Sequence, residues 1–204
     1  NNHHQKPNEG EDMQMFERDV PGENKAGLSG QSIGNLPLET CETMNGMWGY
    51  KVEDQNYKST QELIQLLVRT AAKGANLLLN IGPQPDGNLP DAALERLRSM
   101  GEWLHSKAGE SIYGTKAGSV AMGDSIVSTQ SSDGKCLYIH LLKTQTSATS
   151  ITLPMEVHRF KRVTTLMNSE AVTYKYDKKR KQTTFYLPKR KENELTDFII
   201  KLNK

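Results

Sequence analysis

Two glutamates in the first forty residues each follow a large apolar residue. Phe16 precedes Glu17, and Leu38 precedes Glu39. Apolar surroundings disfavour the ionised form of a carboxyl group, so such a group can keep a proton and donate it near neutral pH. The two positions are therefore candidates for a general acid. A carboxylate paired with Arg18 is the alternative for Glu17, and a structural hydrogen bond is the alternative for Glu39.

An aromatic residue follows within the stretch CETMNGMWGY, residues 41–50. This stretch is a poor helix and a doubtful strand. A run that reads as a buried strand and ends on Gly-Pro, NLLLNIGP, begins 26 residues after Tyr50. We interpret the two segments as parts of one ligand pocket. Core packing is one role open to Trp48 and is the expected role of Trp103.

Other chemistry has little support in the sequence. No glycine-rich phosphate loop is present, and Cys41 and Cys136 lie too far apart to suggest a metal site, so we expect no cofactor and no metal. A disulfide between the two cysteines is not expected. Asn80 and Asp86 follow the buried run and are expected to shape its loop. The histidines show no ligand spacing: His3, His4, His105, His140 and His158.

The elements around these residues follow α/β order. Residues 59–73 are predicted to form a helix, because Ser59 and Glu62 fit a capping box and an apolar face follows. Residues 77–81 are predicted to form a strand buried on both faces, and Pro90 then begins a second helix that ends near residue 109. In such folds the loops that follow the strands hold the active site.

The pattern changes after Tyr113. Short runs rich in β-branched residues alternate with turns, which predicts an antiparallel β-sandwich over residues 116–204. We therefore predict two domains, an α/β domain over residues 1–115 and an all-β domain over residues 116–204.

Composition excludes some classes of function. Of the 204 residues 35% are hydrophobic, and no run approaches a membrane span. Residues 151–204 carry 13 Lys and Arg against 6 Asp and Glu, but the basic run KYDKKRKQ is interpreted as a solvated hairpin tip. We expect neither nucleic acid nor a membrane as a partner. The polar start without Met suggests a chain that begins inside a longer protein.

Several segments resemble the glycoside hydrolase family 29 α-L-fucosidases. The similarity covers most of residues 11–115, while the sandwich matches in type and position. The resemblance implies a catalytic (β/α)8-like barrel followed by a β-sandwich. Residues 1–115 would then be the last barrel units, and their partner would be the missing N-terminal barrel portion. The matching segments are Glu39-Thr40-Cys41, Trp48-Gly49-Tyr50, TQELIQLLVRTAAKGANLLLNIGPQPDG and ERLRSMGEWLHSKAGESIYGT.

The resemblance also implies a reaction, the retaining hydrolysis of terminal α-linked L-fucose from glycans by two carboxyl groups about 5–5.5 Å apart. The family nucleophile, an Asp in a Trp-Asn-Asp-like strand end, has no counterpart in these 204 residues. Residues 12–18 match the family's acid/base segment, which implies Glu17 as the acid/base and Glu39 as the second choice. Trp48 and Glu39 are implied to bind substrate.

Two other functions remain open at this point. Without a nucleophile, the chain could be a carbohydrate-binding module that holds fucosylated glycan without cleaving it. A basic sandwich that binds nucleic acid is the third reading, and it would need aromatic residues among the cations. The resemblance implies a secreted, periplasmic or lysosomal protein.

Overall fold

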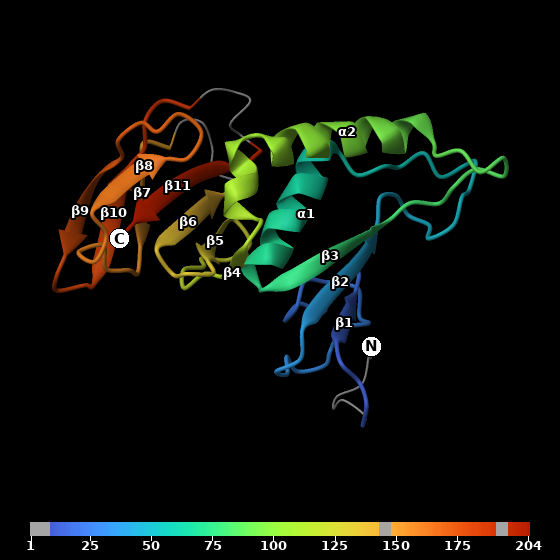
Figure 1. The fold of residues 1–204 in the computed structure, drawn as a ribbon, viewed down its shortest axis with the longest axis horizontal. Coiled ribbons are helices and arrows are strands. Elements are labelled where there is room, and N and C mark those ends of the chain that lie inside the picture. The colour runs from blue at the N-terminus through green and yellow to red at the C-terminus, as the bar shows by residue number, and fades with distance from the viewer. Residues whose placement is uncertain (1–8, 143–147, 191–195) are drawn as a thin grey trace. The chain divides into compact units, whose positions relative to one another are not determined.

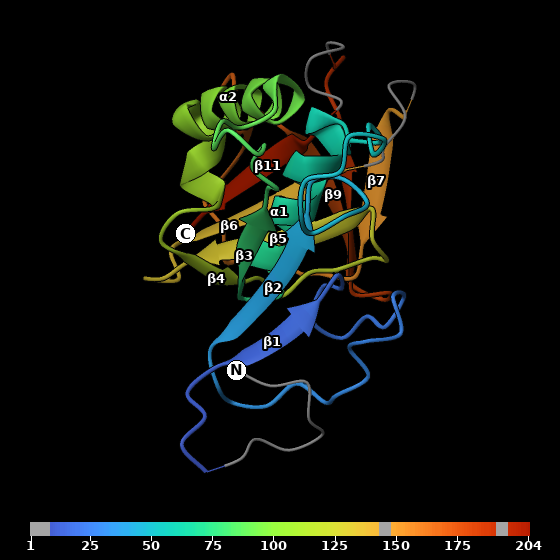
Figure 2. The same ribbon diagram turned by 90° about the vertical axis from the view of Figure 1, so that its right-hand side faces the viewer.

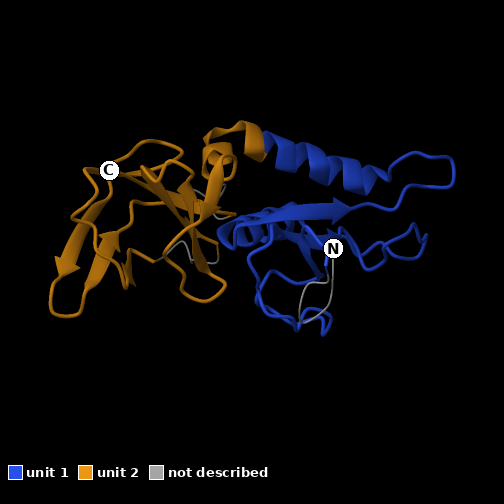
Figure 3. Cartoon of the chain, turned by 60° about the horizontal axis from the view of Figure 1, so that its bottom comes forward, with its two compact units in different colours: residues 1–102 blue, residues 103–204 orange. Residues whose placement is uncertain are grey.

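The computed structural model describes residues 9–142, 148–190 and 196–204 (Figure 1). Contacts within the chain divide it into two compact units, residues 1–102 and residues 103–204 (Figure 3). The division falls inside helix α2, which spans Asp91–His105. The domain boundary near residue 115 that the sequence suggests stays a prediction.

The first unit is built on three parallel strands. Strands β1 (Gln14–Glu17), β2 (Leu38–Thr43) and β3 (Ala75–Asn80) lie side by side in that order (Figures 1 and 2). Helix α1 (Thr60–Ala72) connects β2 to β3 and packs against β3, as a crossover between parallel strands requires. The predicted order of helix, strand, loop and helix is confirmed.

The two faces of this sheet differ in exposure. Phe16 and Thr40, which are neighbours across β1 and β2, are fully buried on one face. On the other face Leu78 is 51% exposed. The prediction that the strand at residues 77–81 is buried on both faces is therefore wrong. The three strands do not close into a barrel, so within the described residues nothing covers this face at Leu78.

Helix α1 begins with the predicted capping box. The Ser59 hydroxyl accepts a hydrogen bond from the backbone N–H of Glu62 (3.2 Å), and the Glu62 carboxylate accepts one from the backbone N–H of Ser59 (2.7 Å). The bonds from Ser59 hold the pKa of Glu62 below its usual value. This stabilisation is therefore present at neutral pH and is lost as the pH falls through the folded-state pKa of Glu62.

Replacing Ser59 by Ala is expected to lower the free energy of unfolding by about 0.5–2 kcal/mol, because it removes the N-cap acceptor. Urea unfolding followed by circular dichroism measures this change. The adjacent Gln61→Ala variant is the control, since Gln61 is exposed and makes no capping bond. Equal stability of the two variants would show that the cap contributes nothing.

The second unit contains two antiparallel sheets. Their inner faces share one hydrophobic core, to which Ile139, Leu153, Phe185 and Ile200 contribute. The predicted β-sandwich is thus consistent with the structure. One sheet has the order β4-β5-β6-β11-β8: Thr115–Ala117, Ile126–Ser131, Cys136–Leu141, Phe198–Asn203 and Arg162–Thr165. The other has the order β7-β10-β9: Ser150–Leu153, Gln182–Tyr186 and Thr173–Asp177.

Smaller features of the second unit can also be compared with the sequence. Helix α2 ends at His105, earlier than the predicted end near residue 109, and a 3-10 helix, Lys107–Ser111, follows it. Trp103 packs against a cluster that includes Ala108 and Tyr138, which confirms its packing role. The basic run forms the turn between β9 and β10, as predicted.

Cys41 and Cys136 are both free thiols. Over the described ranges, neither α1 nor α2 combines the length and the apolarity that a membrane span needs.

Candidate functional site

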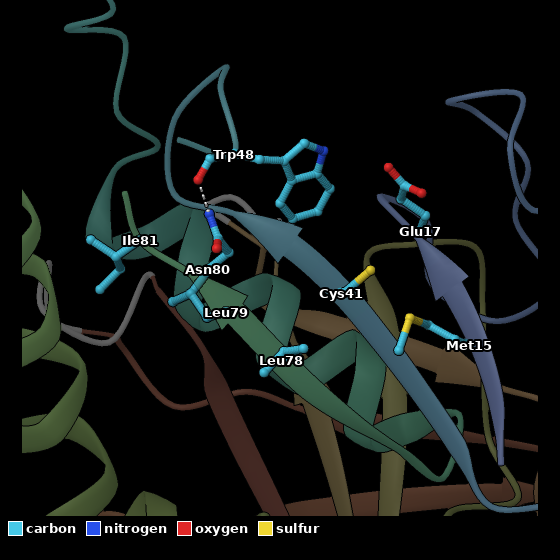
Figure 4. A pocket seen from close by; sticks show the side chains of 8 residues that line it. All are labelled: Met15, Glu17, Cys41, Trp48, Leu78, Leu79, Asn80 and Ile81. Atoms are coloured by element: carbon cyan, nitrogen blue, oxygen red, sulfur yellow. Dashed lines mark hydrogen bonds between the residues drawn. The ribbon is translucent and has the colours of Figure 1, made fainter. Parts of the chain in front are cut away.

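A pocket of about 490 Å³ opens on the sheet of the first unit (Figure 4). It contains two of the predicted site residues, Glu17 and Trp48, and it does not contain Glu39. The lining residues are Met15, Glu17, Cys41, Trp48, Leu78, Leu79, Asn80 and Ile81.

Strand register explains why these residues meet. Glu17 is the last residue of β1 and lies beside Cys41 of β2, which in turn lies beside Leu78 of β3. Side chains alternate between the faces of a strand, so this row shares one face of the sheet. In Figure 4 the Glu17 carboxylate and the Trp48 indole both lie near the Cys41 thiol. A carboxyl group and an aromatic ring thus share one end of the sheet.

The loop that carries Trp48 is fixed by the end of β3. Asn80 Nδ2 donates hydrogen bonds to the Trp48 carbonyl oxygen (2.6 Å) and to the Thr43 hydroxyl (3.2 Å). That hydroxyl donates in turn to the Met47 carbonyl oxygen (2.9 Å). The loop-shaping role expected for Asn80 is confirmed. Its hydrogen bond to the Trp48 carbonyl oxygen fixes the backbone that carries the indole.

Arg18 links Glu17 to the same loop, a role that sequence reasoning missed. Its backbone N–H donates to the Cys41 carbonyl oxygen (2.8 Å), and its Nη2 donates to the Gly46 carbonyl oxygen (2.8 Å). Its guanidinium carbon lies 5.2 Å from the centre of the Trp48 ring. Arg18 has a φ of 59°, a left-handed conformation that is uncommon outside glycine. The guanidinium is therefore directed at the Trp48 loop.

Gly82 supports the aromatic segment by close approach. A Cβ atom at Gly82 would lie 2.4 Å from the backbone nitrogen of Tyr50 and 2.5 Å from the carbonyl carbon of Gly49. No side chain fits in this space, because both contacts are with backbone. Only glycine lets the strand end and the Trp-Gly-Tyr segment touch, which explains the Gly at this point of the IGP sequence.

Replacing Gly82 by Ala is expected to lower the free energy of unfolding by about 1–3 kcal/mol, the range for overpacking, and to move the Trp48 indole. Urea unfolding gives the first change. The fluorescence of Trp48 in a Trp103→Phe background gives the second. Gly101→Ala is the matched control, because no atom lies within 4 Å of a Cβ there and α2 gains a better helix former. Wild-type emission from Gly82→Ala would contradict this account.

The surroundings of the pocket thiol favour its protonated form. Burial is the main cause that raises the pKa of Cys41, and the charges of Glu17 and Glu39 raise it further. A thiol with a raised pKa stays protonated and is a weak nucleophile. Cys41 therefore contributes a small, neutral surface to the pocket.

The remaining predicted residues, Glu39 and Asp86, do not line the pocket. Glu39 is on the same face as Cys41 but two residues earlier in β2, where its neighbours across the sheet are Met15 and Asn76. Asp86 lies in the loop after β3, and hydrogen bonds from Asn88 lower its pKa. That geometry fits a loop-shaping residue. No group of three or more His, Cys, Asp or Glu side chains suited to a metal ion occurs among the described residues.

Comparisons with known proteins point to one family. Residues 1–110 match the family model of α-L-fucosidase. Plasma α-L-fucosidase of Rattus norvegicus is 46% identical over 80 residues, which are 38% of this chain and 17% of the rat protein. α-L-Fucosidase of Dictyostelium discoideum is 42% identical over 79 residues, 38% of this chain and 17% of that protein.

Solved structures match over more of the chain. α-L-Fucosidase isoenzyme 1 from Paenibacillus thiaminolyticus superposes with a TM-score of 0.77 at 27% sequence identity. The match covers 94% of this chain and 45% of that one. The aligned part is thus less than half the length of the bacterial protein and under a fifth of the rat protein.

Proposed function

Because the chain belongs to the α-L-fucosidase family, we propose that it supplies part of the active site of an enzyme that removes terminal α-linked L-fucose from glycans. The observation that carries the proposal is the pocket shared by Glu17 and Trp48. A carboxyl group can transfer a proton there, while an indole can face the sugar.

In the proposed mechanism, Glu17 is the acid/base. It donates a proton to the leaving oxygen while a second carboxylate attacks the anomeric carbon, and it later takes a proton from the water that releases fucose. The second carboxylate comes from the missing N-terminal barrel portion, since the 204 residues hold no Trp-Asn-Asp-like segment. Cys41 does not replace it, because burial keeps its thiol protonated.

The lining of the pocket supports fucose as the sugar. The C6 methyl group of fucose is an apolar patch, and Met15, Cys41 and Leu78 offer it an apolar wall. Trp48 stacks on the ring, and Arg18 keeps the indole in place. Glu39 binds a polar group of the substrate from the same face of the sheet. The positions of Trp48, Arg18 and Glu39 on the sheet and its loop favour the roles proposed for them.

The open face of the sheet supports a barrel completed by another segment. Three parallel strands with an exposed Leu78 suit the last units of a (β/α)8-like barrel, over residues 1–115, whose missing strands cover this face. The sandwich over residues 116–204 follows this barrel. Relatives named as plasma and tissue enzymes favour a secreted or lysosomal location, or a periplasmic one in bacteria.

Release of nitrophenol from 4-nitrophenyl α-L-fucoside tests the function in two proteins. The 204-residue chain alone is expected to show no turnover. The second protein is a chimera, in which these residues replace the part of the P. thiaminolyticus enzyme that they superpose on, and it is expected to hydrolyse the substrate. A chimera that folds and binds L-fucose without cleaving the substrate would favour the carbohydrate-binding module instead.

A further inference from the structure

The turn between β9 and β10 presents four consecutive cations. Lys178, Lys179, Arg180 and Lys181 connect Asp177, the last residue of β9, to Gln182, the first residue of β10. All four are exposed. None of them forms an ion pair with a residue that the structure describes. The four charges are therefore directed to solvent.

The turn that carries them has a defined backbone. Asp177 Oδ1 accepts hydrogen bonds from the backbone N–H groups of Lys179 (2.9 Å) and Arg180 (3.1 Å). Asp177 and Gln182 are register partners, so the two strands meet directly below the turn. The nearest carboxylate is thus used to shape the backbone, and the cations are displayed on a fixed support.

One of the four cations occupies a strained position. Lys181 has a φ of 51°, a left-handed conformation that Gly and Asn adopt at lower cost. The position nevertheless carries a fourth positive charge. This is consistent with a turn in which charge is favoured over the least strained backbone.

We infer that this basic turn, residues 178–181 with Lys175 of the adjoining strand, binds an anionic glycan that carries sulfate or carboxylate groups. Lys175 is exposed on β9 and adds a fifth charge. Cations on flexible stems suit dispersed anionic groups along a chain. The choice of a glycan rests on the proposed function, because the substrate of a fucosidase is itself a glycan.

Nucleic acid fits the turn less well. Single-stranded binding relies on aromatic rings among the cations. The exposed tyrosines of this sheet, Tyr174 and Tyr186, lie near the ends of β9 and β10 that are remote from the turn. Tyr176 is nearer to the turn, but it is partly buried against the core and its hydroxyl donates to Glu156 Oε1 (3.0 Å). The turn thus offers charge with little surface for base stacking, which suits sulfate and carboxylate groups on sugars.

Retention of the purified chain on immobilised dextran sulfate, with neutral dextran as the blank, tests the inference. The variant Lys178→Gln/Lys179→Gln/Arg180→Gln is expected to bind roughly 10- to 100-fold more weakly. Lys116→Gln/Lys161→Gln/Arg162→Gln is the matched control, with the same charge change at exposed positions elsewhere in the second unit. It should bind like wild type. Equal losses in both variants would overturn the inference, because general attraction between charges then explains the binding.

Two further measurements separate the remaining explanations. Lys181→Gly should raise the melting temperature by relieving strain and should still weaken binding; unchanged binding would show that the turn is only a connection. Tighter binding to a DNA duplex than to dextran sulfate at the same salt concentration would overturn the choice of a glycan. Neither Glu17 nor Trp48 takes part, so this test and the fucosidase test can fail independently.

Discussion

Replacing Glu17 by Gln in the active chimera is expected to lower kcat by about 10²–10⁴-fold on a fucoside with a poor leaving group. The amide has the size of the carboxyl group but can neither donate the proton that the leaving oxygen needs nor accept one from water. Glu17 ends β1 and lines the pocket with Trp48, which is the proposed site of this proton transfer. Steady-state kinetics on a fucosyl disaccharide measures the loss.

The choice of leaving group distinguishes acid/base catalysis from a binding role. Nitrophenolate leaves without a proton, so the first step should be nearly unaffected for the nitrophenyl substrate, and azide should restore turnover because it attacks without a base. Glu39→Gln is the matched control, since Glu39 shares the face of the sheet but does not line the pocket. It should change KM more than kcat. A larger loss of kcat in Glu39→Gln than in Glu17→Gln would identify Glu39 as the acid/base and leave Glu17 with a role in substrate binding.

Replacing Asp197 by Ala is expected to cost about 3–5 kcal/mol of the free energy of unfolding of the second unit. His140 Nδ1 lies 2.7 Å from Asp197 Oδ2, and both side chains are fully buried. The Thr129 hydroxyl donates to the Ser111 carbonyl oxygen (2.6 Å), so it accepts from His140 Nε2 (3.1 Å). Both imidazole nitrogens therefore have partners, and removing the carboxylate leaves one of them buried and unpaired.

Urea unfolding in a Trp48→Phe background measures this loss, because Trp103 then reports on the second unit alone. Glu170→Ala is the control, since the Glu170 side chain is exposed and, among the described residues, only its backbone groups are bonded; it should change stability little. The double variant His140→Leu/Asp197→Leu should recover part of the loss by replacing both polar partners with apolar groups. Wild-type stability of Asp197→Ala would contradict the role given to this network.

The sequence predicts those elements that are determined by residues close together in the chain. The capping box at Ser59 and the basic turn before Gln182 are specified within a few positions, and both were confirmed. Glu17 and Trp48 each match a different segment of the family, and the structure brings both into one pocket.

Features that depend on distant backbone contacts escaped prediction. The role of Gly82 follows from its approach to Gly49 and Tyr50, more than thirty positions earlier in the chain. Arg18 reaches Gly46 only because β1 and β2 pair in one register. A continuous apolar run is typical of a strand buried on both faces, whereas Leu78 is exposed; in the proposed barrel, strands from another segment cover it.

The most direct test is to locate the nucleophile of the chimera. A 2-deoxy-2-fluoro-L-fucosyl fluoride slows hydrolysis of the glycosyl-enzyme intermediate, so the attacking carboxylate keeps the sugar, and mass spectrometry of peptides identifies it. We expect a label on a peptide of the upstream barrel part and none within residues 1–204. A label on a peptide that contains Asp12, Glu17 or Glu39 would show that the nucleophile lies in this chain and would contradict the assignment of Glu17 as the acid/base.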